Sequence, residues 1–218
     1  MTGADVFVLA GPPGSGKGTQ AKLLAPKLRV PHISLGDLLR EAVRNKTNVG
    51  EVAKGYLDAG KLVPDQVAID VAEEAVNKKE CNNGFVIDGF PRTVEQAKLF
   101  DGLIGKLGFN LKKVLYIDIS LEEILRRLTG RRSCSKCGAV YHVQFNPPKC
   151  EDICDNCGGP LRQRHDDTAE VIKVRYEVYK EQTYPMMEYY RKTGKLARID
   201  GSKPVNEVFK EVSKAVAS

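Results

Sequence analysis

The sequence predicts an α/β fold in which a mostly parallel sheet is flanked by helices. Three short apolar runs, residues 6–10, 85–88 and 114–118, are predicted strands buried on both faces, and the last two end in aspartate. Helical segments separate these runs, and such alternation favours a parallel sheet with helices on both faces. A glycine-rich turn that follows the first run and opens a helix supports the same class.

The first half of the chain supplies most of the predicted core elements. The glycine-rich segment 11–18 follows the first strand and leads into a helix that ends at about Leu28. Helical periodicity returns at 93–107, between the second and third apolar runs. Ser120 has the residue type of an N-cap, for a helix that we expect to continue to about Arg131.

The last fifty residues are predicted to complete the core. Residues 168–192 form a long charged helix that Thr168 caps. Residues 196–200 form a last short strand. Pro204 is expected at the first position of a terminal helix, where proline is favoured.

Two segments interrupt the alternation and look like insertions. Residues 34–63 contain short helices at about 36–43 and 49–57, with a break at Gly60. Residues 132–167 are rich in Cys, Gly and Pro and contain β-type residues at 141–145. We therefore expect a core made of residues 1–33, 64–130 and 168–218, an insertion at 34–63 and a second insertion at 131–167.

The composition is that of a globular protein. The 218 residues are enough for one sizeable core with small insertions, and 42% of them are hydrophobic and 28% charged. The net charge of +6 suits a phosphate-bearing partner but does not separate a nucleotide from a nucleic acid. No run approaches the ~20 apolar residues that cross a bilayer, and no signal peptide is visible. We expect a cytoplasmic protein without a membrane partner.

The glycine-rich turn has the pattern of a phosphate-binding loop. Residues 11–17 fit G-x-x-x-x-G-K after a predicted strand and before a predicted helix. In this pattern the glycines let backbone N–H groups point at phosphate oxygens, and Lys17 reaches the outer phosphates. The strict pattern continues with Ser or Thr, whereas here Gly18 precedes Thr19. The alternative, an ordinary glycine-rich turn, is disfavoured because the motif has a predicted strand before it and a predicted helix after it.

Several motifs together carry a resemblance to a known family. They are the loop Gly11 to Gln20, the segment Asp88 to Thr93 with Gln96, Gly36-Asp37 with Arg40, Gly130 to Arg132, Arg164 to Asp167, and Asp200-Gly201. On these motifs the sequence resembles the adenylate kinases over essentially the whole chain. The resemblance implies a P-loop NTPase-type core, a nucleoside monophosphate (NMP)-binding insertion at 34–63 and a lid at 131–167. It also implies Mg²⁺-dependent, reversible phosphoryl transfer from ATP to AMP, giving two ADP.

The resemblance assigns roles to particular side chains. Arg40 and Arg92 would hold the acceptor phosphate, and Gln96 would read the adenine edge of AMP. The implied catalytic residues are Lys17, Arg92, Arg131, Arg164 and Arg175, the last three neutralising the donor phosphates and the transferring group. The full implied nucleotide-binding set is Gly14, Ser15, Gly16, Lys17, Gly18, Thr19, Ser34, Leu35, Arg40, Val63, Gly89, Arg92, Gln96, Arg127, Arg131, Arg164, Arg175 and Lys203.

Other positions leave more than one interpretation open. Asp88 ends a strand beside the loop and is expected to hold Mg²⁺ directly or through water, although an isolated strand-end aspartate more often caps a turn. Asp166 and Asp167 either fix the lid arginines or place negative charge before a helix. Leu35 departs from the family pattern, which has Thr there, and this affects how the acceptor base is recognised. Arg127 is expected to stack on the donor base.

Four of the six cysteines have the spacing of a zinc site. Cys134 and Cys137 form one C-x-x-C pair and Cys154 and Cys157 form another, with sixteen residues between the two pairs. Four thiolates close the coordination shell, so we expect the Zn²⁺ to be structural. Cys150 is interpreted as a bystander, and Cys81 is given no role.

The motifs leave three alternatives open. Another nucleoside monophosphate kinase, for instance one that pairs GTP with AMP, would share these motifs. A zinc-ribbon nucleic-acid-binding protein would need a basic face with exposed aromatics, and the lid's basic residues are interleaved with Glu151, Asp152 and Asp155. An inactive nucleotide-binding module would be expected to lack a motif residue, and none is missing. We expect ATP and AMP as substrates, no nucleic-acid partner, and a monomer.

Overall fold

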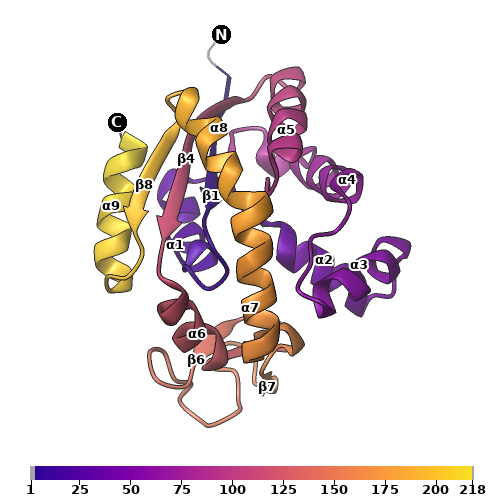
Figure 1. Ribbon diagram of the computed structural model, residues 1–218, viewed down its shortest axis with the longest axis vertical. Helices are drawn as coiled ribbons and strands as arrows, with labels where there is room; N and C mark the ends of the chain where they lie inside the picture. The colour runs from indigo at the N-terminus through magenta and orange to yellow at the C-terminus, as the bar shows by residue number, and fades with distance from the viewer. Residues whose placement is uncertain (1–2, 218) are drawn as a thin grey trace.

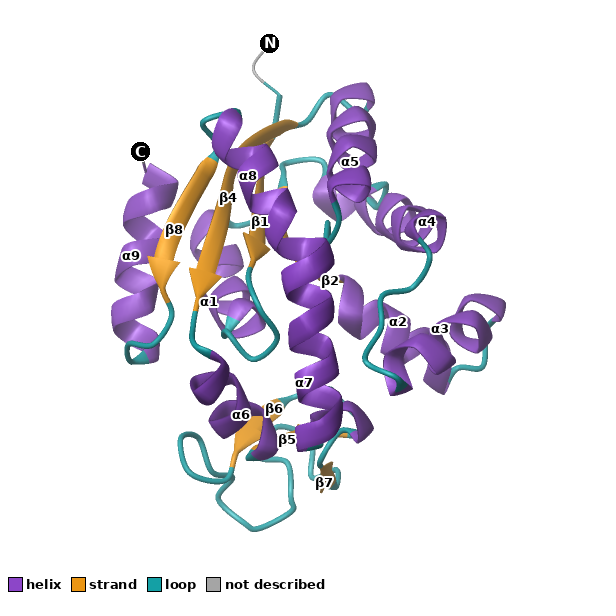
Figure 2. Ribbon diagram, in the orientation of Figure 1, coloured by secondary structure: helices purple, strands orange, loops and turns teal. Residues whose placement is uncertain are grey.

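The computed structural model describes residues 3–217, so residues 1, 2 and 218 of the predicted core lie outside it. Its central sheet is parallel, and the strands follow the order β2-β3-β1-β4-β8. These strands are β1 (Asp5–Ala10), β2 (His32–Ser34), β3 (Phe85–Asp88), β4 (Asn110–Asp118) and β8 (Leu196–Asp200). Figures 1 and 2 show β1, β4 and β8 side by side. The predicted α/β class with a mostly parallel sheet is therefore confirmed.

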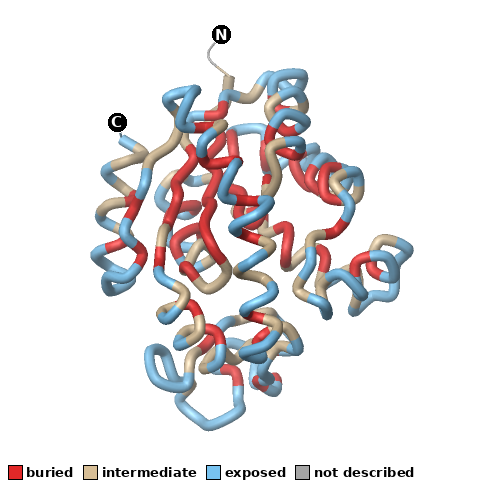
Figure 3. Tube along the Cα trace, viewed as in Figure 1, coloured by how far each residue is buried: buried red, intermediate tan, exposed pale blue. Residues whose placement is uncertain are grey.

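Helices cover both faces of this sheet because successive side chains of each strand point to opposite faces. Val6 and Val8 pack in the cluster that contains Phe100 of α5 (Val94–Lys106) and Met186 of α8 (Tyr184–Lys192). Phe7 and Leu9 pack on the other face, in the cluster that contains residues of α1 (Lys17–Leu28) and α9 (Val205–Ala217). Strands β1 and β4 are consequently buried along most of their length (Figure 3).

The first predicted insertion is helical. It contains α2 (Leu35–Arg44) and α3 (Asn48–Asp58), close to the predicted helices, and the Thr47 hydroxyl caps α3 by accepting the Gly50 N–H at 3.1 Å. Two neighbouring elements were not predicted. Strand β2 immediately precedes α2, and α4 (Asp65–Val76) follows the insertion and packs beside α5 (Figure 1).

The second predicted insertion forms its own small antiparallel sheet in the order β6-β5-β7. Its strands are β5 (Arg131–Cys134), β6 (Val140–His142) and β7 (Leu161–Arg162). Helix α6 (Leu121–Thr129) leads into this sheet, and it ends two residues before the predicted boundary because β5 begins at Arg131. Helix α7 (Ala169–Val178) leads back towards the core (Figure 1).

The helix expected at 168–192 is present as α7 and α8, joined without interruption by one wider turn. Between α7 and α8 the chain makes one π-helical turn, Tyr179–Thr183, in which the Tyr184 N–H bonds to the Tyr179 carbonyl. Pro185 explains the wider turn, since proline has no N–H to donate and its ring clashes with the carbonyl four residues earlier. The terminal helix α9 begins at Val205, one residue after the predicted start at Pro204.

No helix within residues 3–217 is both long enough and apolar enough to cross a membrane.

Candidate active site

One large cavity lies where the carboxyl ends of β1, β2 and β3 meet the two inserted segments. Its volume is about 1070 Å³. Every residue that the sequence assigned to catalysis or nucleotide binding lines this cavity, and so does Asp88. These residues are spread along the chain from Gly14 to Lys203, and the fold brings all of them to one space. The four cysteines of the C-x-x-C pairs lie outside it.

The glycine-rich loop forms one wall of the cavity. Gly11 has a φ of 141°, and a side chain there would meet the Ile117 carbonyl oxygen at 2.2 Å, so only glycine fits. Lys17 opens α1, and its ammonium donates to the carbonyls of Gly11 at 2.9 Å and Pro12 at 2.7 Å. Burial and the positive charge of Arg92 lower the pKa of Lys17 to about 7. The loop thus holds a cation whose charged form a phosphate would favour.

Arginine side chains face one another across the cavity. Burial and the charges of Arg175 and Arg40 lower the pKa of Arg92 to about 10. Burial and the charges of Arg131 and Arg40 lower the pKa of Arg164 to about 9. Each arginine therefore makes the charged form of another less favourable. Such a cluster is suited to a ligand with several negative charges placed between the guanidinium groups.

Asp166 and Asp167 hold two of these arginines. Arg131 donates to both carboxylate oxygens of Asp167, at 2.8 and 2.6 Å, and Asp167 is fully buried. Arg175 lies 2.9 Å from the Asp166 carboxylate and 3.2 Å from that of Asp167. Burial by itself raises the pKa of Asp166, but the charge of Arg175 outweighs burial and holds that pKa below its ordinary value. The contacts favour the interpretation that this pair fixes the lid arginines.

Asp88 brings a carboxylate to the phosphate loop. It is buried at the end of β3, and a Cβ placed on Gly18 would lie 3.8 Å from its Oδ2. Its Oδ2 also contacts Nε2 of His32, a residue that the sequence analysis missed. A carboxylate at a phosphate-binding loop is the kind of oxygen ligand that Mg²⁺ prefers, so the residues present fit the ion.

The expected acceptor end of the cavity is formed by the segment that follows β3. The Arg92 side chain donates from Nε to the Gly89 carbonyl at 2.7 Å. Gln96 is buried, and its amide contacts the Arg92 backbone N–H and the carboxylate of Asp65. Leu35 and Val63 are buried residues that also line this end. The expected acceptor pocket thus places one buried amide beside apolar side chains.

The expected donor end lies between α6, β6 and the start of α9. Arg127 donates to Glu123 at 2.5 Å and to the Gly201 carbonyl at 2.9 Å, which holds the guanidinium beside the loop that precedes α9. The His142 and Phe145 rings stack with centroids 4.2 Å apart. The Arg126 guanidinium lies 4.5 Å from the centre of the Phe145 ring. Arg126 is a lining residue that sequence reasoning did not single out.

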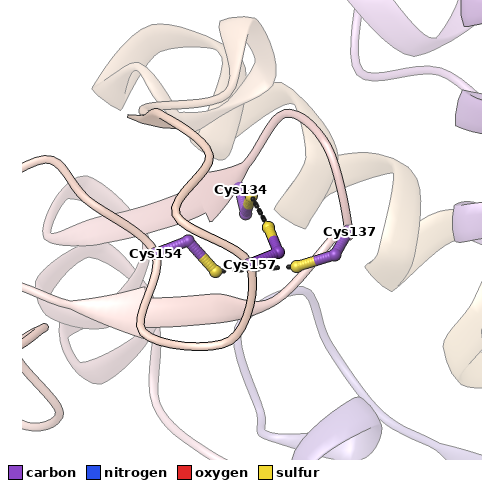
Figure 4. A group of neighbouring side chains, drawn as sticks. All are labelled: Cys134, Cys137, Cys154 and Cys157. Carbon is purple, nitrogen blue, oxygen red and sulfur yellow. Dashed lines mark hydrogen bonds between the residues drawn. The ribbon is translucent and has the colours of Figure 1, made fainter.

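The four C-x-x-C cysteines cluster in the second insertion (Figure 4). Their sulfur atoms all lie within 4.8 Å of one another, and Cys134 and Cys157 are 3.5 Å apart. A tetrahedral Zn²⁺ with Zn–S bonds of about 2.3 Å needs sulfurs about 3.8 Å apart. The Ala139 backbone N–H lowers the pKa of the Cys137 thiol, but the neighbouring thiols outweigh it and raise that pKa to about 12. The cluster could hold a metal ion, whose charge would let all four thiols ionise.

The fold and the site together define a class of protein. A parallel sheet, a glycine-rich loop that opens α1, and an arginine-lined cavity beyond the strand ends make this a P-loop nucleotide-binding protein of the phosphotransferase type.

Comparisons with known proteins narrow the class to one family. A family model described as adenylate kinase matches residues 9–195. The chain is 50% identical over 210 residues to the adenylate kinase of Methanocella arvoryzae, covering 96% of this chain and 97% of the other. It is 48% identical to that of Carboxydothermus hydrogenoformans, covering 96% and 98% of the two chains. The chain belongs to the adenylate kinase family and is thus a nucleoside monophosphate kinase.

Proposed function

We propose that the protein transfers a phosphoryl group reversibly from ATP to AMP, giving two ADP, with Mg²⁺. The observation that carries this proposal is a single cavity with a phosphate loop on one side, a buried glutamine amide on another and arginines facing the space between. Two nucleotides that meet phosphate to phosphate match this arrangement.

The residues supply positioning and charge, which is most of what phosphoryl transfer needs from a protein. Lys17 and the loop amides hold the donor phosphates, and Arg40 and Arg92 hold the acceptor phosphate. Arg131, Arg164 and Arg175 stabilise the charge on the transferring group. Mg²⁺, held through Asp88, would neutralise charge on the phosphate oxygens when bound. The segments 34–63 and 131–167 close over acceptor and donor and exclude water.

We also assign the cysteine cluster to a structural zinc. The ligands would be Cys134, Cys137, Cys154 and Cys157, which leave no coordination position for water or substrate. The ion would hold the small antiparallel sheet together at a distance from the transferring phosphate.

A coupled assay of ADP formation tests the proposed reaction. With Mg²⁺, ATP and AMP should give two ADP per turnover, and a chelator of Mg²⁺ should stop the reaction. AMP should have a higher kcat/KM than GMP, CMP or UMP, because the buried Gln96 amide can pair with adenine. ATP should be preferred less strictly over GTP, because the donor base is expected to meet mainly Arg127 and backbone near Lys203. Preference for a pyrimidine acceptor would contradict the proposal.

A further inference from the structure

The buried amide of Gln96 has a fixed orientation. Its Oε1 accepts the backbone N–H of Arg92 at 2.7 Å, and its Nε2 donates to Oδ1 of Asp65 at 2.7 Å. A backbone N–H can only donate and an ionised carboxylate can only accept. Turning the amide over would place two donors face to face at Arg92 and two acceptors face to face at Asp65. The two contacts therefore define which amide atom lies on which side.

Asp65 makes its contact from outside the cavity. It is the first residue of α4 and is half-buried, and it does not line the cavity, whereas Gln96 does. The Thr93 hydroxyl lies 3.4 Å from both carboxylate oxygens of Asp65 and also accepts the Gln96 backbone N–H at 3.0 Å. Asp65 thus links the start of α4 to the start of α5, and it contacts the Gln96 amide on the side away from the cavity.

The orientation of this amide decides which purines it can pair with. After the two contacts, one Nε2 hydrogen and one Oε1 lone pair remain for a ligand. Adenine offers the complement, an amino donor at position 6 beside a ring-nitrogen acceptor. A 6-oxopurine has an oxygen acceptor at position 6 instead, which would face the Oε1 acceptor. A fixed amide therefore favours the 6-amino group, while a freely turning amide would favour it much less.

We propose that Asp65 is a positioning residue that makes the acceptor site select a 6-aminopurine over a 6-oxopurine by fixing the Gln96 amide. The inference rests on the proposed function, because it takes the Gln96 end of the cavity as the acceptor site. Asp65 itself touches neither nucleotide.

The test compares Asp65→Asn with the wild type, using AMP and IMP as acceptors, which differ at position 6. The asparagine keeps the size of the side chain but removes the obligatory acceptor. The ratio of kcat/KM for AMP to that for IMP should fall by at most roughly 10- to 100-fold, the range of one good bidentate base contact, because the Arg92 N–H still holds Oε1. Calorimetric Kd values for AMP and IMP give the same ratio if turnover of IMP is too slow.

Two further variants serve as controls. Asp70→Asn removes an exposed carboxylate from the same helix and should leave the ratio unchanged. Asp65→Glu keeps an obligatory acceptor and should retain most of the selectivity. Both are assayed well below their melting temperatures, so that Asp65→Glu still decides the question if Asp65→Asn folds poorly.

The outcomes separate this inference from the proposed function. An unchanged AMP-to-IMP ratio in Asp65→Asn, or equal losses for both acceptors, would overturn the role of Asp65. A loss of selectivity in Asp65→Glu as large as in Asp65→Asn would overturn it as well. Wild-type protein that forms no ADP from ATP and AMP would instead contradict the proposed function.

Discussion

Lys17 combines a functional position with an unfavourable environment. Its ammonium is held by two carbonyls of the phosphate loop, yet burial and the charge of Arg92 lower its pKa to about 7. The unfolded chain has neither effect, so the ordinary value of 10.5 applies there. The charged side chain thus destabilises the folded protein near neutral pH, and a bound phosphate would offset the cost.

The first prediction at this scale is a pH dependence that Lys17 causes. Between about pH 7 and 10.5 the unfolded state binds a proton that the folded state has released, so stability should rise with pH. The rise due to Lys17 is at most about 1.4 kcal/mol per pH unit. Urea unfolding without nucleotide at pH 7 and 9 should show a steeper rise for the wild type than for Lys17→Met. Equal slopes would contradict the prediction.

The same variant should separate activity from stability. Lys17→Met should lower kcat by roughly a thousandfold or more, because a charge beside the outer phosphates is lost. The melting temperature of Lys17→Met should stay at or above that of the wild type even though its activity falls. Near-normal turnover would remove the loop lysine from the mechanism.

At the scale of elements, the small sheet β6-β5-β7 depends on its cysteines. The segment 131–167 is too short to bury a core of its own, and its buried cluster consists of Cys134, Tyr141, Cys154 and Leu161. Small units without a sufficient hydrophobic core are commonly stabilised by a structural metal, since the binding free energy of the metal contributes to the free energy of folding.

We predict that zinc removal unfolds this segment first. Purified protein should contain about one zinc per chain, and a strong chelator should lower the melting temperature while the core stays folded. Activity should fall, because Arg131 and Arg164 lie near the two ends of the segment and would lose their positions. Cys134→Ser should lose the metal, whereas Cys150→Ser, outside the cluster, should keep it. Metal-free wild type with an unchanged melting curve would show that the four thiols do not form a zinc site.

Asp167 connects strand β5 to helix α7 through their arginines. Asp167→Asn leaves Arg131 and Arg175 near one another without the fully buried carboxylate. Removing one partner from a buried ion pair typically costs about 3 kcal/mol. Chemical denaturation should show a loss of that order, with a lower kcat, while Glu170→Gln on the exposed first turn of α7 should be nearly neutral. A loss no greater than that of Glu170→Gln would contradict the prediction.

On the scale of the whole molecule, the sequence predicted the elements that are apolar or contain a compact motif. Strands buried on two faces appear as continuous apolar runs, which identified β1, β3 and the end of β4. Strand β2 was missed because Ile33 is its single buried residue and its register comes from pairing with β3. Helix α4 lies between the recognised motifs and was left unassigned.

The candidate site was predictable to a similar extent and for a similar reason. Loop and arginine motifs are local in sequence, and the structure brings their residues to one cavity. Their supporting partners are not local. His32 is 56 residues from Asp88, and Asp65 is 31 residues from Gln96. A single aspartate after a proline gives no sequence signal for such a contact, because its meaning comes from the packing of α4 beside α5.

The π-helical turn at Tyr179–Thr183 also constrains how the chain length can vary. Helix α7 presents Arg175 to the cavity, while α8 places Met186 and Tyr190 in the core. The extra residue of the π-helical turn therefore fixes how far α7 is rotated about the helix axis relative to α8. Deleting one residue there would turn α7 by about 100° relative to α8 and carry the guanidinium off the cavity wall. Insertions and deletions among relatives should therefore fall in the loops of the small sheet and avoid this turn.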